Sequence, residues 1–385
     1  MEVGYLEAFS KIWNHCWIEW HERGPTKTFL TDFILEISNY GFISAKDILI
    51  CLLLGVAFTI LRYFLTEALF KPFFSWCQLL EKDQKKCPES AFKFLFYSSA
   101  YGYCSYILFN GKYNFFQDTS NCWKGWYKGM PVPQDIYMLY VVEAGFYFHS
   151  IYATLFMDQW RRDSILMIMH HILTNLLIFF SLAIRYHRIG VLVLFLHDIN
   201  DIFLEFSKLC LGFKSRGGKY HVIPDILSVA GVLSFASLWL YCRLYLYPIK
   251  VLHSTGCDGR PYAPTAPFYF FFNAMLWMLF FMNLWWFQFI VWLIIRIMVG
   301  KSRGVEDTRE IPKESGKNGA PGKAMNGNIG KNGELSVSNG ANHVIQSSNS
   351  AEDSKKREEN GEHHFKKDSK EQFRHRQPLT KPANP

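Results

Sequence analysis

Histidines and aspartates occur inside two long apolar stretches of the chain, where a lipid bilayer would otherwise surround them with hydrocarbon. The first stretch contains His170 and His171, and the second contains Asp198 and Asp201. Each ionisable group in a membrane helix costs at least ~2.5–3.5 kcal/mol, so such groups face a protein interior or a wet cavity. An imidazole beside carboxylates can move protons near neutral pH. The pattern therefore predicts a catalytic cavity inside a membrane protein.

The polar residues of the second stretch recur at helical spacing. Asp198 and Asp201 are three residues apart, and both His197 and Glu205 lie four residues from Asp201. Residues three or four apart share one face of a helix. These side chains are therefore expected to point in one direction.

The depths of the polar residues also agree. At a rise of ~1.5 Å per residue, His170 lies roughly 9 Å and Asp201 roughly 15 Å from the same membrane edge. Thr174 shares the helical face of His170, and His149 on the preceding apolar stretch is at a similar depth. We therefore expect one polar cavity that opens toward that edge.

Three kinds of site could use these residues. A histidine could act as a general base toward an amine or hydroxyl, or attack an acyl group itself. A His–Asp pair could instead only join two helices, which contributes ~0.6 kcal/mol on average. An iron centre of the membrane desaturase kind needs several histidine pairs, whereas His363–His364 lies in the polar tail and His170–His171 stands alone in the membrane. The pattern favours acid–base chemistry without a metal.

Long apolar runs set the fold class, since 50% of the 385 residues are hydrophobic. One helical span needs roughly 20 apolar residues. We predict an all-α, polytopic bundle of about seven transmembrane helices, at residues 48–69, 91–109, 135–157, 164–184, 189–211, 224–247 and 268–299. The turn between the fourth and fifth spans is short, so these two helices should be antiparallel neighbours. Arg62 is expected to snorkel to the membrane surface, and loops are expected at 70–90 and 248–267.

The chain divides by composition into an N-terminal lumenal or interfacial segment (1–46), a membrane domain (47–300) and a tail (301–385). The tail has too few apolar residues to offset its ordering entropy, and we predict that it is disordered. It holds 16 Lys and Arg against 12 Asp and Glu, whereas the N-terminal segment is net negative. The positive-inside rule then predicts a cytosolic tail and a lumenal N-terminus. Aromatic residues are nearly absent from the tail, which argues against nucleic-acid binding.

Cys122 and Cys257 both fall in loops that this orientation places on the lumenal side. A disulfide between them and two free thiols are both compatible with that compartment.

A longer pattern around the polar residues resembles the Lag motif in the TLC domain of ceramide synthases. Its residues here are His170-His171, Thr174, Arg185, Gly190, Leu196-His197-Asp198, Asp201, Leu204-Glu205 and Lys208. Further stretches are similar to the same family: Pro88–Ala91, His149–Thr154, Trp160–Ser164 and Phe213–Gly218. The resemblance covers about residues 88–299. The loop at 70–90 is too short for the homeobox-like domain of most members, so the chain is similar to members that lack it.

The resemblance implies an endoplasmic reticulum enzyme. It would transfer a long-chain acyl group from acyl-CoA, a co-substrate, to sphinganine or sphingosine. The implied chain length is 18 carbons, and residues 253–267 would set it. No cofactor is implied. Membrane lipids and a homodimer or a heterodimer with related synthases are the implied partners.

Under this interpretation the predicted residues have three roles. The catalytic set is His170, His171, Asp198 and Asp201, with one histidine as base or acyl acceptor and the aspartates orienting it. The substrate cavity would be lined by His149, Tyr152, Thr174, His197 and Glu205. Cations near the cytosolic edge could contact the CoA phosphates or be ordinary positive-inside residues: Arg161, Arg162, Lys214 and Arg216.

Two other functions are compatible with the sequence. A non-enzymatic TLC-type protein, such as a lipid transporter, a sensor or a translocon-associated protein, would share the bundle without needing the His-His and Asp-x-x-Asp residues. A seven-span receptor would open its ligand pocket toward the opposite side. An assay of N-acylation would distinguish these functions.

Overall fold

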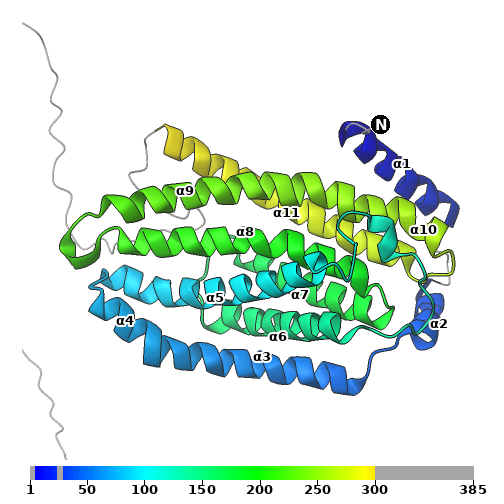
Figure 1. Ribbon diagram of the computed structural model, residues 1–385, viewed down its shortest axis with the longest axis horizontal. Helices are drawn as coiled ribbons and strands as arrows, with labels where there is room; N and C mark the ends of the chain where they lie inside the picture. Colours follow the sequence, from blue (N-terminus) through cyan, green and yellow to red (C-terminus); the bar gives the residue numbers. More distant parts are fainter. Residues whose placement is uncertain (1–4, 24–28, 300–385) are drawn as a thin grey trace, which may run out of the picture. The chain divides into compact units, whose positions relative to one another are not determined.

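The computed structural model describes residues 5–23 and 29–299, and within those ranges every regular element is a helix. Figure 1 shows the long helices side by side, with the α4–α5 and α8–α9 turns at one end of the bundle and α2 and α10 at the other. In chain order the elements are α1 (Tyr5–Arg23), α2 (Phe29–Tyr40), α3 (Ala45–Leu65), η1 (Thr66–Phe70), α4 (Lys71–Trp76), α5 (Glu81–Phe109), η2 (Thr119–Cys122), α6 (Gln134–Phe156), α7 (Ser164–Ala183), α8 (His187–Phe213), η3 (Arg216–Gly218), α9 (Val222–Leu238), η4 (Trp239–Leu252), η5 (Ser254–Asp258), α10 (Gly259–Tyr262) and α11 (Tyr269–Met298).

Helix α8 lies at the centre of the bundle. It packs against α5 and α9, and it also contacts α6, α7 and η4. This helix carries His197, Asp198, Asp201 and Glu205. Neighbouring helices surround it, so its polar side chains face protein rather than lipid, as the cost of placing them in hydrocarbon requires.

The outer helices have the composition of membrane spans. Within the described ranges, four helical segments are long and apolar enough to cross a bilayer: Ala45–Trp76, Ser164–Ala183, Val222–Tyr262 and Tyr269–Met298. The chain is therefore a multi-pass membrane protein. Helices α5, α6 and α8 match three more of the predicted spans in position, but they do not meet the same criterion. The number seven stays a prediction.

The predicted loop at 70–90 is wrong in its extent. The first span continues as helix to Trp76, the chain reverses within residues 77–80, and α5 begins at Glu81. Glu, Lys and Gln are good helix formers, and Glu89 and Lys93 form an ion pair one turn apart. The polar segment is therefore a helix end rather than a loop.

The predicted loop at 248–267 is also mostly helical. Helix α9 continues through the π-helices η4 and η5 and through α10 to Tyr262, although Pro248 lies inside η4. A proline in an α-helix clashes with the carbonyl four residues earlier, whereas a π-helix bonds residues five apart. The backbone N–H of His253 accordingly donates to Pro248 O. Cys257 lies in η5, and it and Cys122 are free thiols.

The N-terminal segment packs on the membrane domain. Helix α1 contacts η4 and η5, and the Tyr5 hydroxyl donates to Leu244 O at 2.7 Å. The boundaries and the lumenal position of segment 1–46 stay predictions. The predicted disordered tail lies outside the described residues.

Arg62 belongs to a charge cluster and does not snorkel. Its side chain is buried and donates to Asp158 Oδ1 at 2.5 Å. Lys93 lies 2.8 Å from the other Asp158 oxygen and 2.6 Å from Glu89. Burial alone would raise the pKa of Asp158, but Lys93 and Arg62 hold that pKa well below its usual range. The cluster ties α3, α5 and the α6–α7 turn together at one end of the bundle.

We predict that Asp158→Asn lowers the free energy of unfolding by ~3 kcal/mol at neutral pH, because it leaves two buried cations without their shared carboxylate. Thermal or denaturant unfolding in detergent measures this change. The lowered pKa means that Asp158 stabilises the fold above its unfolded pKa. The difference between variant and wild type should therefore shrink as the pH falls below about 4.

The matched control is Glu67→Gln, which removes the exposed Glu67–Lys71 pair. Exposed pairs contribute little, so we expect a change below about 0.5 kcal/mol. Equal stability of the Asp158 and Glu67 variants would contradict a stabilising role for the Asp158 carboxylate.

Candidate active site

A wide cavity lies among α5, α6, α7, α8, α9, η4 and α11, with a volume of about 120 Å³. It extends along α8 toward the end of the bundle that holds the α8–α9 turn. Its polar lining residues come from several helices, and apolar side chains form the rest of its wall. These polar residues are Tyr97, Tyr147, His170, His171, Asp201, Ser207, Lys208 and Arg243.

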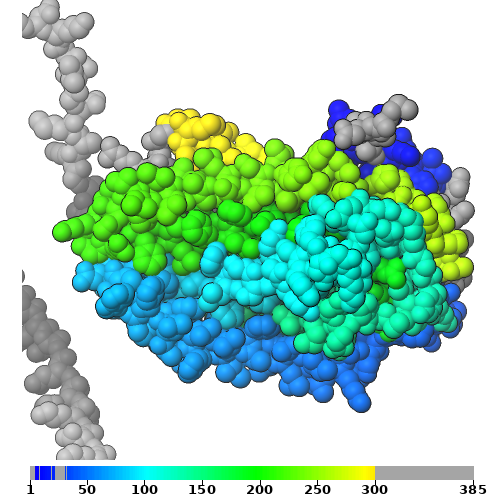
Figure 2. Space-filling view, in the orientation of Figure 1, coloured from blue at the N-terminus to red at the C-terminus, as the bar shows by residue number. Residues whose placement is uncertain are grey.

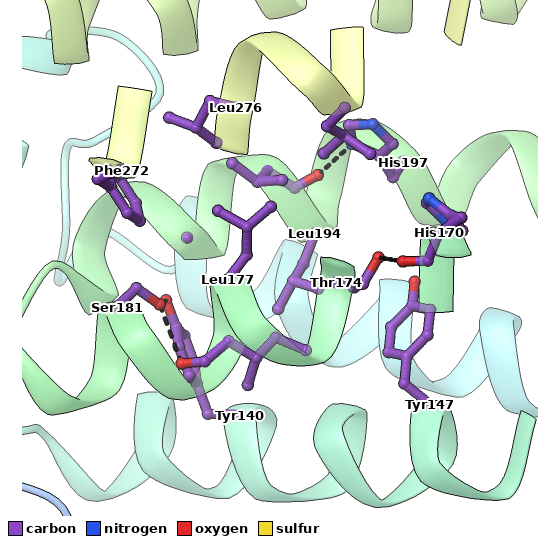
Figure 3. Close-up of a pocket in the computed structure, with 14 residues that line it drawn as sticks. Tyr140, Tyr147, His170, Thr174, Leu177, Ser181, Leu194, His197, Phe272 and Leu276 are labelled. Atoms are coloured by element: carbon purple, nitrogen blue, oxygen red, sulfur yellow. Dashed lines mark hydrogen bonds between the residues drawn. The ribbon is translucent and has the colours of Figure 1, made fainter. Parts of the chain in front are cut away.

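A second, narrow cavity of about 30 Å³ begins at His170 and Tyr147, which line both cavities. Figure 3 shows these two residues at one end of the narrow cavity and Phe272, Ser181 and Tyr140 at the other. Between them the walls are almost entirely apolar. The histidine therefore stands where a cavity with charged and polar groups in its wall meets an almost entirely apolar one.

The far end of the narrow cavity is closed by a hydrogen-bonded group. Tyr140 donates to His187 O at 2.9 Å, and Ser181 Oγ donates to the Tyr140 hydroxyl at 3.2 Å. Gly190 allows this approach, because a Cβ there would lie 1.8 Å from the Tyr140 hydroxyl oxygen. A glycine is therefore required at this position for the end to close as it does.

The structure brings both of the histidines that were predicted to be catalytic, His170 and His171, to the wide cavity. The His170 ring lies edge-on to Trp286, with centroids 5.3 Å apart, and the Trp286 indole donates to Asp163 at 3.1 Å. Neither His170 Nδ1 nor His171 Nδ1 has a hydrogen-bond partner among the described residues. Aromatic packing, rather than a carboxylate, therefore holds the His170 ring.

The two aspartates that were predicted to be catalytic are placed differently from each other. Asp201 lines the wide cavity, whereas Asp198 is fully buried behind it. Within the described residues, neither carboxylate hydrogen-bonds to His170 or His171. The expected orientation of the catalytic histidine by an aspartate is thus not seen in this arrangement.

Arg243 is a site residue that the sequence analysis missed. Its guanidinium is buried and donates to Asp201 Oδ2 and to His197 O, each at 2.8 Å. It also lies over the Trp239 ring, 4.1 Å from the centroid. The signal was a lone arginine within an apolar span. Its pairing with Asp201 could not be deduced from the sequence, because it depends on the register of π-helix η4 against α8.

The predicted cavity residues are divided between the cavities and the surrounding core. Thr174 and His197 line the narrow cavity. Thr174 donates to His170 O at 2.8 Å, and His197 Nε2 lies 3.1 Å from the Asn283 amide nitrogen. His197 Nδ1 lies 2.8 Å from Val193 O. Each ring nitrogen of His197 therefore has a hydrogen-bond partner.

Three other predicted cavity residues lie elsewhere. His149 is buried against α3, with Nδ1 2.9 Å from the Thr59 hydroxyl. Glu205 pairs with Lys208 at 2.7 Å. Tyr152 corrects the prediction most clearly, since its side chain is 47% exposed and packs on Phe156. Although it lies only three residues after the buried His149, Tyr152 is on the outer face of α6.

The cations predicted to contact CoA do not line either cavity. Arg161 lies in the α6–α7 turn, 3.6 Å from Glu89. Lys214 pairs with Asp225 at 2.7 Å beside the α8–α9 turn, and Arg216 is exposed in that turn. Arg162 is also exposed. Among the described residues, no group of three or more His, Cys, Asp and Glu side chains could hold a metal ion.

Comparisons with known proteins cover most of the membrane domain. The family model for the TLC domain matches residues 86–292. The chain is 43% identical to human ceramide synthase 1 over 288 residues, which is 75% of this chain and 82% of the relative. It is 41% identical to mouse ceramide synthase 1 over 288 residues, again 75% of this chain and 82% of the relative. It is 31% identical to the Arabidopsis thaliana ceramide synthase LOH1 over 236 residues, 58% of this chain and 72% of the relative.

We predict that Gly190→Ala destabilises the protein by ~1–3 kcal/mol, because the added methyl group would overlap the Tyr140 hydroxyl. In the double variant with Tyr140→Phe, the loss should be smaller than the sum of the two single losses by about 1 kcal/mol. Unfolding of the four proteins in detergent gives this coupling.

Gly102→Ala serves as the control, since a Cβ at that position meets no atom within 4 Å. We expect it to be neutral or slightly stabilising, as alanine is the better helix former. If the losses of stability in Gly190→Ala and Tyr140→Phe simply add in the double variant, the close contact of Gly190 with the Tyr140 hydroxyl is contradicted.

Proposed function

The chain belongs to the ceramide synthase family, and on that basis we propose that it transfers an acyl group from acyl-CoA to the primary amine of sphinganine or sphingosine. The observation that carries this proposal is the position of His170, which stands between a cavity that contains charged and polar groups and a cavity whose walls are almost entirely apolar. Acyl transfer to a sphingoid base needs both environments at the reacting carbon, since the amine and the thioester are polar and the chains are not.

The reaction defines the task of the base. The thioester C–S bond breaks and an amide C–N bond forms, and CoA leaves as the thiol. The amine can attack only after it has lost a proton, so a neutral imidazole within reach of it is needed. His170 is the better placed of the two histidines, because it lines both cavities and His171 lines only the wide one. Attack by the His170 ring on the acyl carbon, followed by transfer to the amine, is equally compatible with this position.

We assign the cavities to different parts of the substrates. The acyl chain would enter the narrow cavity, whose side chains must move apart to admit it, because its volume is about 30 Å³. The wide cavity would hold the thioester and the amine of the base. There the Arg243–Asp201 pair supplies a fixed dipole, and Asp201 could accept a hydrogen bond from the amine. Asp198 does not line the cavity, so it would act indirectly, by positioning the residues that do.

The CoA nucleotide would remain in water at the end of the bundle. Arg161, Arg162, Lys214 and Arg216 lie in the two turns at that end, and guanidinium groups match phosphate geometry. We propose that this end faces the cytosol, where acyl-CoA is available, with the N-terminus lumenal and the C-terminus cytosolic. Residence in the endoplasmic reticulum membrane and assembly with a second synthase chain complete the proposal.

His170→Ala should lower N-acylation of sphinganine by at least about 10²-fold in purified protein, because a general base contributes roughly that factor or more. His171→Ala should lose less. The matched control is His221→Ala, since His221 lies at the start of α9 and lines neither cavity. Full activity of the His170 variant would refute the assignment. Absence of N-acylation in the wild-type protein would instead favour a non-enzymatic function.

We predict that the wild-type protein prefers an 18-carbon acyl-CoA over shorter and longer chains, in assays with labelled sphinganine and a graded panel. Leu276→Trp should shift the preference toward shorter chains, because Leu276 lies near the far end of the narrow cavity. Leu284→Trp, on the exposed face of the same helix, is the control. An unchanged preference in the Leu276 variant would exclude the narrow cavity as the chain site.

A further inference from the structure

Glu143 is a buried acid to which the proposed mechanism gives no task. It lies on α6, and its side chain is completely inaccessible to solvent. Asp198 on α8 is equally inaccessible, and the two carboxyl groups are close enough to hydrogen-bond to each other. Among the described residues, no N–H or hydroxyl group donates to any of their four oxygens. Each carboxyl group therefore has only the other as its partner.

The charges around this pair do not balance two ionised carboxylates. The nearby cation is Arg243 of η4, and it already donates to Asp201. Asp201 itself adds a further negative charge. The remaining neighbours are tyrosine and cysteine side chains: Tyr97, Tyr101 and Cys104 on α5, and Tyr147 on α6. One guanidinium thus stands against three carboxyl groups.

We propose that Glu143 and Asp198 hold at least one proton between them at neutral pH, as a carboxyl–carboxyl pair across the α6–α8 interface. Two carboxylates in contact, with no cation bonded to either of them, cannot both stay ionised in a low-dielectric interior. One shared proton supplies the missing donor, and the resulting O–H···O⁻ bond is a strong one. The pair then satisfies two otherwise orphaned buried acids at once.

This bond gives Glu143 and Asp198 a positioning role. Glu143 is one helical turn from Tyr147 on α6, and Asp198 is three residues from Asp201 on α8. Tyr147 and Asp201 both line the wide cavity. A bond between the residues behind them fixes the spacing of the two cavity walls. It also explains why Asp198 can matter to the site without reaching His170.

Infrared difference spectroscopy tests the proton directly. In an ester-free detergent at neutral pH, the wild-type protein minus the Glu143→Gln/Asp198→Asn double variant should show a carboxylic-acid C=O band that shifts in D₂O. The two amides are close in shape to the acids and can bond to each other, so the fold should be kept. Absence of this band would overturn the proposal.

Glu89→Gln calibrates the measurement. Glu89 is a carboxylate paired with Lys93 and Arg161, so its removal should leave the acid band unchanged. The infrared experiment needs no substrate, and its outcome is therefore independent of the proposed acyl transfer.

Two single variants test the positioning role, and this arm rests on the proposed function. Glu143→Gln keeps a neutral hydrogen-bonding partner for Asp198, so its N-acylation rate should stay within about threefold of wild type. Glu143→Leu removes that partner and should lose about tenfold or more. Equal losses in the two variants would mean that the charge of Glu143 matters, and would contradict the shared proton.

Discussion

Charged side chains cannot face hydrocarbon, and the arrangement of this bundle follows from that constraint. Each exposed ionisable group would cost ~2.5–3.5 kcal/mol or more, and α8 alone carries two aspartates, a glutamate, two histidines, an arginine and a lysine. The helical segments that contain α3, α7, α9 and α11 are long and apolar enough to cross a membrane. Helix α8 needs neighbours that cover it, and α5, α6, α7, α9 and η4 all contact it. The chamber around His170 is the space that remains among these helices.

Once buried, each ionisable group still needs a partner, and the protein meets this need in different ways along the bundle. At the end of the bundle, Asp158 is shared by Arg62 and Lys93. In the wide cavity, Arg243 bonds Asp201. Behind the cavity, the proposed proton joins Glu143 to Asp198. The histidine that would do the chemistry is held by aromatic rings instead, so its ring nitrogens are not committed to a carboxylate.

The sequence predicted what depends on local pattern and on the cost of burial. The spans at α6, α7, α8 and α11 were placed within a few residues, since long apolar runs define them. The meeting of His170, His171 and Asp201 followed from helical spacing and equal depth. The resemblance to ceramide synthases is confirmed by the relatives.

Features that depend on packing between distant segments could not be predicted. The continuation of α9 through Pro248 as a π-helix has no local signal. It determines where Arg243 meets Asp201. Asp198 was assigned to the site from helical spacing and Tyr152 from the family resemblance, but small differences in helix rotation turn Asp198 into the core and Tyr152 outward. The pairing of Glu143 with Asp198 needs the register of α6 against α8, which no pattern within either helix specifies.

The most direct test of the central claim is an experimental structure of the protein with a non-reactive thioether analogue of a long-chain acyl-CoA. The account predicts that the carbon corresponding to the thioester carbonyl lies beside His170. The acyl chain should run between α7, α8 and α11 toward Tyr140, and the nucleotide should lie near the α6–α7 and α8–α9 turns. An acyl chain bound on the lipid-facing surface, or a His170 side chain turned away from it, would contradict the account.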